Sequence, residues 1–143
     1  MERKHIPTEV RYRVRKEARS RCGYCLARQE LIYHLLQIEH IIPLSKGGTN
    51  DELNLWLACD RCNGHKSDKI SAIDPQTGEE MPLFNPRTQN WWEHFRWSED
   101  GLRVVGLTPT GRATVITLHL DSDPITLAVR ANWVQVGWHP PKK

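Results

Sequence analysis

The sequence lacks a hydrophobic run long enough to cross a membrane. Its longest nearly apolar stretch, residues 31–36, is interrupted by His34, whereas a membrane-spanning helix needs about 20 predominantly apolar residues. The first 21 residues are also too rich in charge for a signal peptide. We therefore exclude a membrane protein and expect a cytoplasmic one.

Cysteine is scarce, and its four copies fall into two Cys-x-x-Cys pairs that begin at Cys22 and Cys59. Structural disulfides are rare in a reducing compartment, and a thioredoxin-like redox motif needs one such pair rather than two. Two residues between the thiols let a tight turn direct both sulfurs at one ion, so two turns complete a closed tetrahedral site. We predict a structural zinc ion bound by Cys22, Cys25, Cys59 and Cys62.

The 143 residues are 38% hydrophobic and 26% charged, which fits one compact domain with a packed core. The formal net charge is +3, but the positive charge is concentrated at the N-terminus, where residues 1–21 hold eight Lys and Arg against three Glu. Such an arm attracts phosphates. A solvated helix face has the same composition, so charge alone leaves both interpretations open.

Residue patterns predict a series of short elements. Val10, Val14 and Ala18 recur every four residues, which predicts a helix over residues 8–20, capped by Thr8, with an arginine-rich outer surface. We expect a buried strand over residues 31–38, a glycine-rich loop over 45–50, a second strand over 53–58 and a helix over 62–70. Pro43 should end the pairing of the first strand.

The order of these signals resembles the HNH endonucleases, which have a ββα-metal fold. Four separate signals occur in the family's order and cover about a third of the chain. The matching residues are Cys22 and Cys25, Glu39-His40-Ile41-Ile42-Pro43, Gly47-Gly48, Asn54-Leu55, and Cys59-x-x-Cys62-Asn63-x-x-Lys66. The resemblance implies a DNA phosphodiesterase with His40 as the general base and Asn54 as the residue that orients it. Asn63 stands where many members have histidine, so the chain is an HNN variant.

Hydrolysis of a phosphodiester needs a base for the water and a cation for the developing negative charge. The pKa of imidazole suits His40 to the first task. Glu39 and Asn63 offer the hard oxygen ligands that Mg²⁺ or Mn²⁺ accepts. His65 is a rival ligand, but positions 63 and 65 lie about 200° apart around a helix, which favours Asn63. Because adjacent strand residues face opposite sides, the strand must twist or end at residues 39 and 40.

Three basic residues are candidates for contacts with DNA, which we expect to be double-stranded. Lys66 lies near a helix N-terminus, where a phosphate contact is favourable, and Arg11 and Arg15 lie on the basic helix. The candidate site residues also have structural interpretations. Glu39 and His40 would be a hydrogen-bonded pair, Asn54 an ordinary turn residue and Lys66 a solvated lysine. Their joint occurrence favours the functional interpretation.

Beyond residue 80 the chain holds five of the six tryptophans. Residues 97–107 predict a hairpin around Asp100-Gly101, and Asp123-Pro124 predicts the start of a helix that stops at Gly137. Residues 112–120 fit a strand by their β-branched content or a helix capped by Thr110. The tryptophans favour a small core over base stacking. This segment resembles the C-terminal extensions of some bacterial, notably cyanobacterial, HNH proteins.

The sequence therefore predicts an α+β fold with three parts: a basic helix at 1–21, a zinc-knuckled ββα-metal nuclease core at 22–79 and a small α+β extension at 80–143, packed on the core. The predicted function is metal-dependent DNA cleavage. The alternatives are a zinc-stabilised nucleic-acid-binding module without catalysis and a zinc domain that contacts proteins. Biological role, sequence preference, nicking against double-strand cleavage, the role of the extension and oligomeric state are left open.

Overall fold

The computed structural model describes residues 5–143. Residues 1–4, which include two cations of the predicted basic arm, lie outside the described residues. The chain divides into two compact units. The N-terminal unit runs up to Ile70 and includes Asn85–Arg87, and the C-terminal unit comprises Ser71–Phe84 and Thr88–Lys143. Short helices and two-stranded sheets make up both units, which confirms the α+β class.

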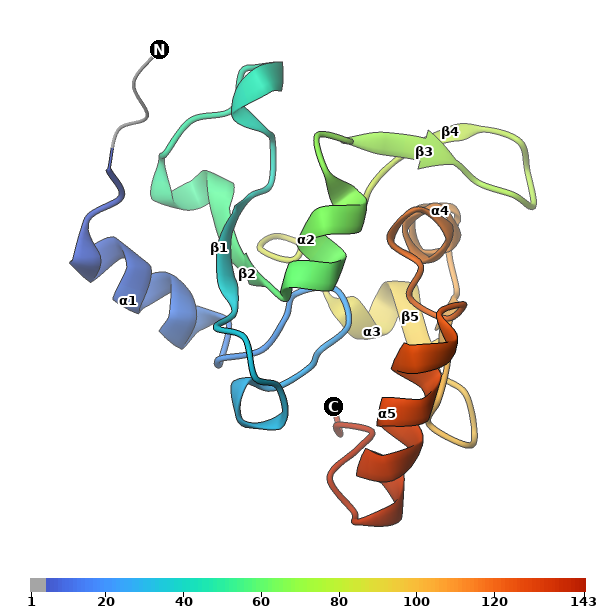
Figure 1. Ribbon diagram of the computed structural model, residues 1–143. Helices are drawn as coiled ribbons and strands as arrows, with labels where there is room; N and C mark the ends of the chain where they lie inside the picture. The colour runs from blue at the N-terminus through green and yellow to red at the C-terminus, as the bar shows by residue number, and fades with distance from the viewer. Residues whose placement is uncertain (1–4) are drawn as a thin grey trace. The chain divides into compact units, whose positions relative to one another are not determined.

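The N-terminal unit is a β-hairpin flanked by two helices (Figure 1). Strand β1 (Gln37–His40) pairs antiparallel with β2 (Leu55–Ala58), so that His40 lies opposite Leu55. Helix α1 (Thr8–Glu17) contacts β2, and helix α2 (Asp60–Lys66) contacts β1. This ββα arrangement confirms the expected core fold.

The predicted helix period places the buried face of α1 correctly. Val14 is fully buried and packs with Ile6 and Leu55 in one hydrophobic cluster, to which Val10 and Ile38 add partly buried side chains. The helix begins one residue after Pro7, without a side-chain cap, so the predicted cap at Thr8 is wrong. Proline at this position fixes its own φ and provides no side-chain acceptor for the first turn.

Residues 31–36 do not form the buried strand that their composition predicts. A 3₁₀ turn covers Gln29–Leu31, and β1 begins only at Gln37. The Gln29 carboxamide closes this segment into a loop, since Nε2 donates to the His34 carbonyl (3.0 Å) and Oε1 accepts from the Leu36 amide (2.8 Å). A side chain that satisfies two backbone groups replaces the strand pairing that these groups would otherwise need.

The C-terminal unit contains two further hairpins and three helices. Their bounds are β3 (Ser71–Ile73), β4 (Glu80–Pro82), α3 (Trp91–His94), β5 (Phe95–Trp97), β6 (Val104–Gly106), α4 (Pro109–Leu118) and α5 (Pro124–Gln135). Strands β3 and β4 pair antiparallel, as do β5 and β6. Helix α4 contacts both hairpins. This close packing needs Gly111, where a Cβ atom would lie 2.2 Å from the His94 carbonyl oxygen.

Turn and cap signals in this unit predict its elements well. The β5–β6 hairpin turns at Gly101, whose φ of +76° is favourable for glycine. Asp123 caps α5 by accepting from the Ile125 amide, as predicted. The ambiguous stretch is helical, but its cap is Thr108, which accepts from the Gly111 amide, and not the expected Thr110; Pro109 occupies the first turn. Trp91 is buried against Phe95 and Trp97, so these rings fill a core.

In the part of the chain that the structure describes, none of the helices combines the length and apolar character needed to cross a bilayer.

Candidate functional site

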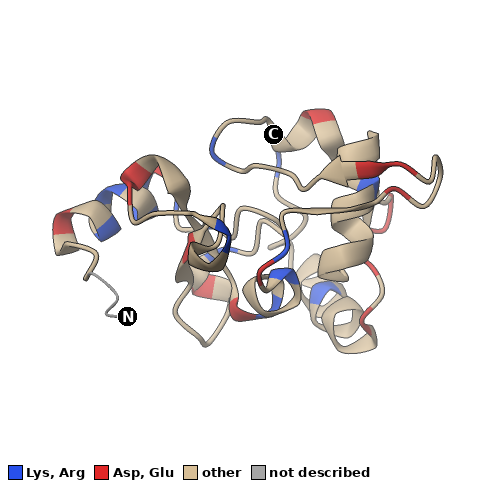
Figure 2. Cartoon of the chain, turned by 90° about the horizontal axis from the view of Figure 1, so that it is seen from above, with Lys and Arg blue, Asp and Glu red and all other residues tan. Residues whose placement is uncertain are grey.

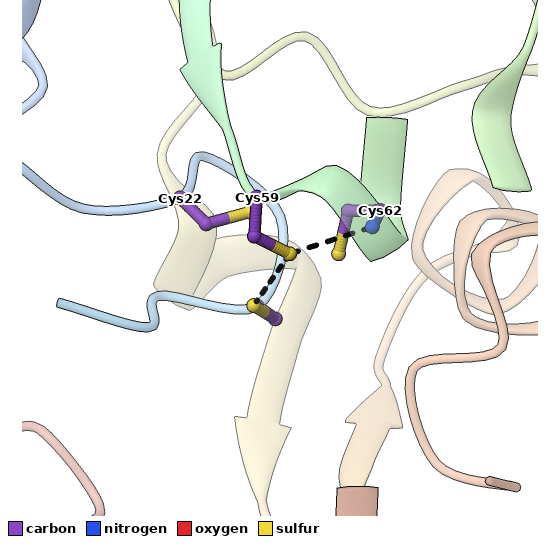
Figure 3. A group of neighbouring side chains, drawn as sticks. Cys22, Cys59 and Cys62 are labelled. Atoms are coloured by element: carbon purple, nitrogen blue, oxygen red, sulfur yellow. Dashed lines mark hydrogen bonds between the residues drawn. The ribbon is translucent and has the colours of Figure 1, made fainter. Parts of the chain in front are cut away.

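The four cysteines converge on one point of the N-terminal unit. Figure 3 shows the sulfur atoms of Cys22, Cys59 and Cys62 gathered between the first knuckle and the start of α2. All four Sγ atoms lie within 4.8 Å of one another, and Cys25 Sγ is 3.8 Å from Cys59 Sγ. A tetrahedral zinc ion with Zn–S bonds of about 2.3 Å sets its sulfurs about 3.8 Å apart. The cysteines are therefore positioned to bind zinc, as predicted.

Local backbone geometry brings the sulfurs together. The first knuckle closes through a bond from the Leu26 amide to the Cys22 carbonyl (3.0 Å). The second knuckle opens α2, where Cys59 is the N-cap and its Sγ accepts from the Cys62 amide (3.4 Å). Gly23 lets the first knuckle approach β2, since a Cβ atom there would lie 2.4 Å from Trp56 Cδ1.

Crowding of the thiols perturbs their acidity. Burial raises the pKa of the Cys22 thiol well above its ordinary value, while hydrogen bonds from Cys22 and the other cysteines hold the pKa of Cys25 well below it. One thiolate is thus favoured at the expense of its neighbours. A divalent cation removes this conflict because it stabilises every thiolate at once.

Glu39 lies on the α2 side of the hairpin, inside the protein. Its side chain is only 2% exposed, and Oε1 accepts from the Tyr24 hydroxyl (2.7 Å) and forms an ion pair with Lys66 Nζ (3.0 Å). Burial raises the pKa of Glu39, opposed by Lys66 and by the Tyr24 hydrogen bond. Oε2 is buried without a hydrogen-bond partner, so one oxygen of this carboxylate is left unsatisfied.

Lys66 is buried beneath the end of β1 instead of lining a phosphate-binding surface. It is 2% exposed, and its ammonium also donates to the His40 carbonyl (3.2 Å) and the Ile41 carbonyl (2.9 Å). With Glu39, these acceptors match the three N–H groups of a lysine. The side chain therefore holds the backbone of His40 in place.

His40 occupies the opposite side of β1 from Glu39, at the last residue of the strand. Its ring is half-buried, and Nε2 lies 2.7 Å from Asn50 Oδ1. A carboxamide oxygen only accepts hydrogen bonds, so in this arrangement Nε2 carries the proton and Nδ1 carries the lone pair. Asn50, which sequence reasoning missed, is thus the side chain that orients the ring.

Asn54, which the resemblance implies orients His40, fixes the loop that follows His40. Its Oδ1 accepts from the Ile42 amide, and its Nδ2 donates to the carbonyls of Ile42 and Thr49, each at 2.9 Å. This clip joins the two ends of the glycine-rich loop. Asn54 therefore acts on His40 through the loop that carries Asn50.

Asn63 lies on α2, on the side of the hairpin that Glu39 faces. Its Nδ2 donates to Gln37 Oε1 (2.7 Å), and Gln37 shares a face of β1 with Glu39 because strand residues alternate. Carboxylate and carboxamide oxygens are ligands that Mg²⁺ and Mn²⁺ accept. His65 is also on α2, two residues further on and half-buried. Within residues 5–143, the four cysteines are the one group of three or more His, Cys, Asp and Glu side chains placed to share an ion.

A groove of about 640 Å³ runs between α1 and the outer face of β1. Its lining residues are His5, Ile6, Arg11, Arg15, Leu35, Leu36, Gln37, Ile38, His40, Leu44 and Asn50. None of them is acidic. The groove thus brings His40 and Asn50 together with two of the predicted DNA-binding residues, Arg11 and Arg15.

The two groove arginines differ from their neighbours on α1. Figure 2 shows basic residues along this helix, and Arg13 among them forms an ion pair with Glu52 (2.7 Å). Arg15 forms no ion pair with a carboxylate in the described part of the chain, and burial together with the charge of Arg11 lowers its pKa. Two like charges that repel each other beside a groove favour an anionic ligand.

Comparison with known proteins agrees with this geometry. Residues 22–69 match the model of the HNH endonuclease family, a segment that contains both knuckles, the hairpin and α2. Comparison with curated proteins and with solved structures gives no match.

Proposed function

We propose that the HNH module of residues 22–69, with its four-cysteine zinc site, is a metal-dependent endonuclease that hydrolyses phosphodiester bonds in DNA. The observation that carries this proposal is the position of His40. Its ring lies in an acid-free groove beside Arg11 and Arg15, and Asn50 holds its Nε2. This position supports the role of a general base beside a groove that attracts a phosphate backbone.

His40 activates the water in this proposal. Asn50 keeps the proton on Nε2, so Nδ1 accepts a proton from the water whose oxygen attacks phosphorus. The bond from phosphorus to the 3′ oxygen breaks, and that oxygen takes up a proton. By resemblance to the family, the products carry 5′-phosphate and 3′-hydroxyl ends.

Glu39 and Asn63 fit the hard-oxygen ligand set of a catalytic divalent cation. The Glu39 Oε2 atom has no hydrogen-bond partner, and Asn63 lies on the same side of the hairpin. A bound Mg²⁺ or Mn²⁺ ion would neutralise the charge that develops on the phosphate and the departing oxygen. Tyr24 and Lys66 hold the Glu39 carboxylate in place.

The decisive experiment compares nicking of supercoiled plasmid by the wild type and by His40→Ala in Mg²⁺. We expect the variant to lose at least about 100-fold in rate, since general-base catalysis contributes factors of this order or larger. His119→Asn, which changes an exposed histidine of the C-terminal unit, should cleave normally. Zinc content and far-UV circular dichroism should be the same in all three proteins. Normal nicking by His40→Ala would refute the assignment.

A DNA-binding module without catalysis is the second candidate. The Lys66–Glu39 ion pair favours it, because the only carboxylate at the proposed cation site is already paired with a buried ammonium. In such a module, the wild type and His40→Ala would bind plasmid with the same affinity. Neither protein would cleave the plasmid in Mg²⁺ or Mn²⁺. Zinc-dependent binding without cleavage by the wild type would therefore select this alternative.

A further inference from the structure

The loop that closes through Gln29 presents apolar side chains to solvent. Tyr33 is completely exposed (104%) and Leu35 is 67% exposed. The next residue, Leu36, is fully buried and anchors the loop to the N-terminal unit. We call Tyr33 and Leu35 the apolar wedge. Its exposure has a free-energy cost, because both side chains would be better stabilised in the core.

The wedge is held in this position before any ligand binds. The Gln29 carboxamide joins the His34 carbonyl to the Leu36 amide, with bonds of 3.0 and 2.8 Å. The Gln29 amide in turn donates to the Ser20 carbonyl (2.9 Å), next to the first knuckle. A loop tied at both ends loses little conformational entropy when it binds, so an exposed aromatic ring on it is well suited to recognition.

The wedge adjoins the groove that contains His40, because Leu35 belongs to both. Leu35 and Leu36 line the groove together with His40, Asn50 and Arg15. His40 lies five residues after Leu35, and extended chain rises about 3.3 Å per residue, so the two Cα atoms lie at most about 17 Å apart. One strand of a DNA duplex advances about 3.4 Å per nucleotide. A strand that follows the groove from His40 therefore meets the wedge within about five nucleotides.

We propose that the apolar wedge inserts against the bases of bound DNA within about five nucleotides of the phosphate at His40, and that the enzyme prefers DNA whose bases are already unstacked there. This inference rests on the proposed nuclease function and adds its substrate class. The acid-free groove with two arginines favours a polyanion over a basic or apolar protein surface. Within a polyanion, base faces are what an aromatic ring and a leucine can contact.

The preference for distorted DNA follows from the cost of insertion. A wedge that enters a regular duplex must unstack a base step, whereas a bulge or a mismatch has already lost that stacking. The groove arginines should contact the backbone of a regular duplex and of a bulged or mismatched duplex equally, because phosphate contacts do not depend on base stacking. The wedge is therefore the part of the groove that distinguishes the two substrates.

The test measures binding by the catalytically inactive His40→Ala chain, zinc-loaded and without Mg²⁺, to labelled 24-base-pair duplexes. One duplex is fully paired and the other carries a two-nucleotide bulge that contains 2-aminopurine. We expect about tenfold tighter binding of the bulged duplex and quenching of 2-aminopurine when the ring stacks on it. Tyr33→Ala/Leu35→Ala should abolish both effects, and Tyr33→Phe should retain them.

Tyr12→Ala is the matched control, because Tyr12 is a 64% exposed tyrosine of α1 that does not line the groove. It should behave as the parent chain. Equal affinity for the two duplexes, or a bulge preference that survives the double substitution, would overturn the inference. It would also be overturned if the double substitution shifted only the dimer–monomer equilibrium in light scattering, since the wedge would then be a protein interface.

Cleavage separates the inference from the proposed function. In Mg²⁺ the wild type should cut the bulged duplex within about five nucleotides of the bulge. A wedge-dependent bulge preference without cleavage would refute the nuclease proposal and leave the wedge as a base-contacting element. Cleavage without any bulge preference would refute the wedge and leave the nuclease.

Discussion

The ammonium of Lys66 joins three parts of the N-terminal unit that are far apart in the sequence. It contacts Glu39 on β1 and the carbonyls of His40 and Ile41, while Tyr24 of the first knuckle donates to the same carboxylate. A buried charge requires such complete pairing, because desolvation is otherwise very costly. Glu39 and the backbone of His40 are thus fixed by side chains that need not touch a substrate.

Removal of this ammonium should destabilise the protein strongly. We expect Lys66→Met to lower the free energy of unfolding by about 3–5 kcal/mol, since it leaves the Glu39 carboxylate buried without its cation. Lys69→Met, at a neighbouring exposed lysine, should change stability by no more than about 0.5 kcal/mol. Urea unfolding of both variants measures the difference. Equal losses would show that the buried pair contributes little.

Single residues were predictable where spacing alone determines their role. Two Cys-x-x-Cys pairs suffice to predict four converging sulfurs, and Val14 follows from helical periodicity. The partner of His40 is Asn50, ten residues away, and it depends on how the Asn54 clip folds the loop between them. Lys66 was assigned to a phosphate from its place on a helix, because burial is a tertiary property that this position does not reveal.

At the scale of elements, capping signals were correct for α5, which begins at Asp123-Pro124, but wrong for α1 and α4, whose caps are Pro7 and Thr108 instead of Thr8 and Thr110. A cap shifted by one or two residues still marks where a helix begins, whereas β-branched residues left α4 ambiguous. Composition was wrong for residues 31–36, where the Gln29 side chain replaces strand pairing. A glutamine five residues before its acceptor and seven before its donor has no recognisable sequence pattern, so this loop was not predictable.

The β3–β4 hairpin is attached to α4 by a buried ion pair. Asp74 is fully buried, and Arg112 of α4 binds it with two bonds of 2.9 Å. The Thr77 hydroxyl and the Gln76 amide also donate to this carboxylate. The Arg112 guanidinium, aided by these hydrogen bonds, holds the pKa of Asp74 well below its usual range.

This depressed pKa predicts how acid affects the C-terminal unit. A carboxylate whose pKa is lower in the folded state adds stability above its unfolded pKa of about 3.9 and loses that contribution as the pH falls toward the folded value. The midpoint temperature of thermal unfolding should therefore decrease as the pH is lowered from 4 to 2. Asp74→Asn should be less stable at pH 7 and should show a shallower decline in acid. Tryptophan fluorescence measures the unfolding of the C-terminal unit, since five of the six tryptophans lie in this unit. If the midpoint temperatures of the wild type and Asp74→Asn declined in parallel with pH, this account would be contradicted.

On the scale of the whole molecule, the two units rely on different sources of stability. The N-terminal unit has a small hydrophobic cluster and four cysteines placed for zinc. The C-terminal unit has a core of packed aromatic rings. The ring centroid of Trp91 lies 5.1 Å from that of Phe95 and 5.7 Å from that of Trp97. Small cores often need a metal, whereas aromatic side chains bury a large area each.

Chelation should therefore act on one unit selectively. When zinc is removed, we expect the amides of β2 and α2 to lose their protection from hydrogen exchange, because these elements flank Cys59 and contain Cys62. Amides of α4 should stay protected. Hydrogen exchange with mass spectrometry, before and after chelation and after zinc is restored, measures both. Simultaneous loss of protection in both units would show that zinc stabilises the whole chain.

Cys59 is both a predicted zinc ligand and the residue that caps α2. We therefore expect zinc binding to stabilise the first turn of the helix that carries Asn63 and Lys66. This fixes an order of maturation for the proposed nuclease, in which metal loading comes first and the hydrolytic centre second. A newly synthesised chain is then harmless to DNA until it has acquired its zinc.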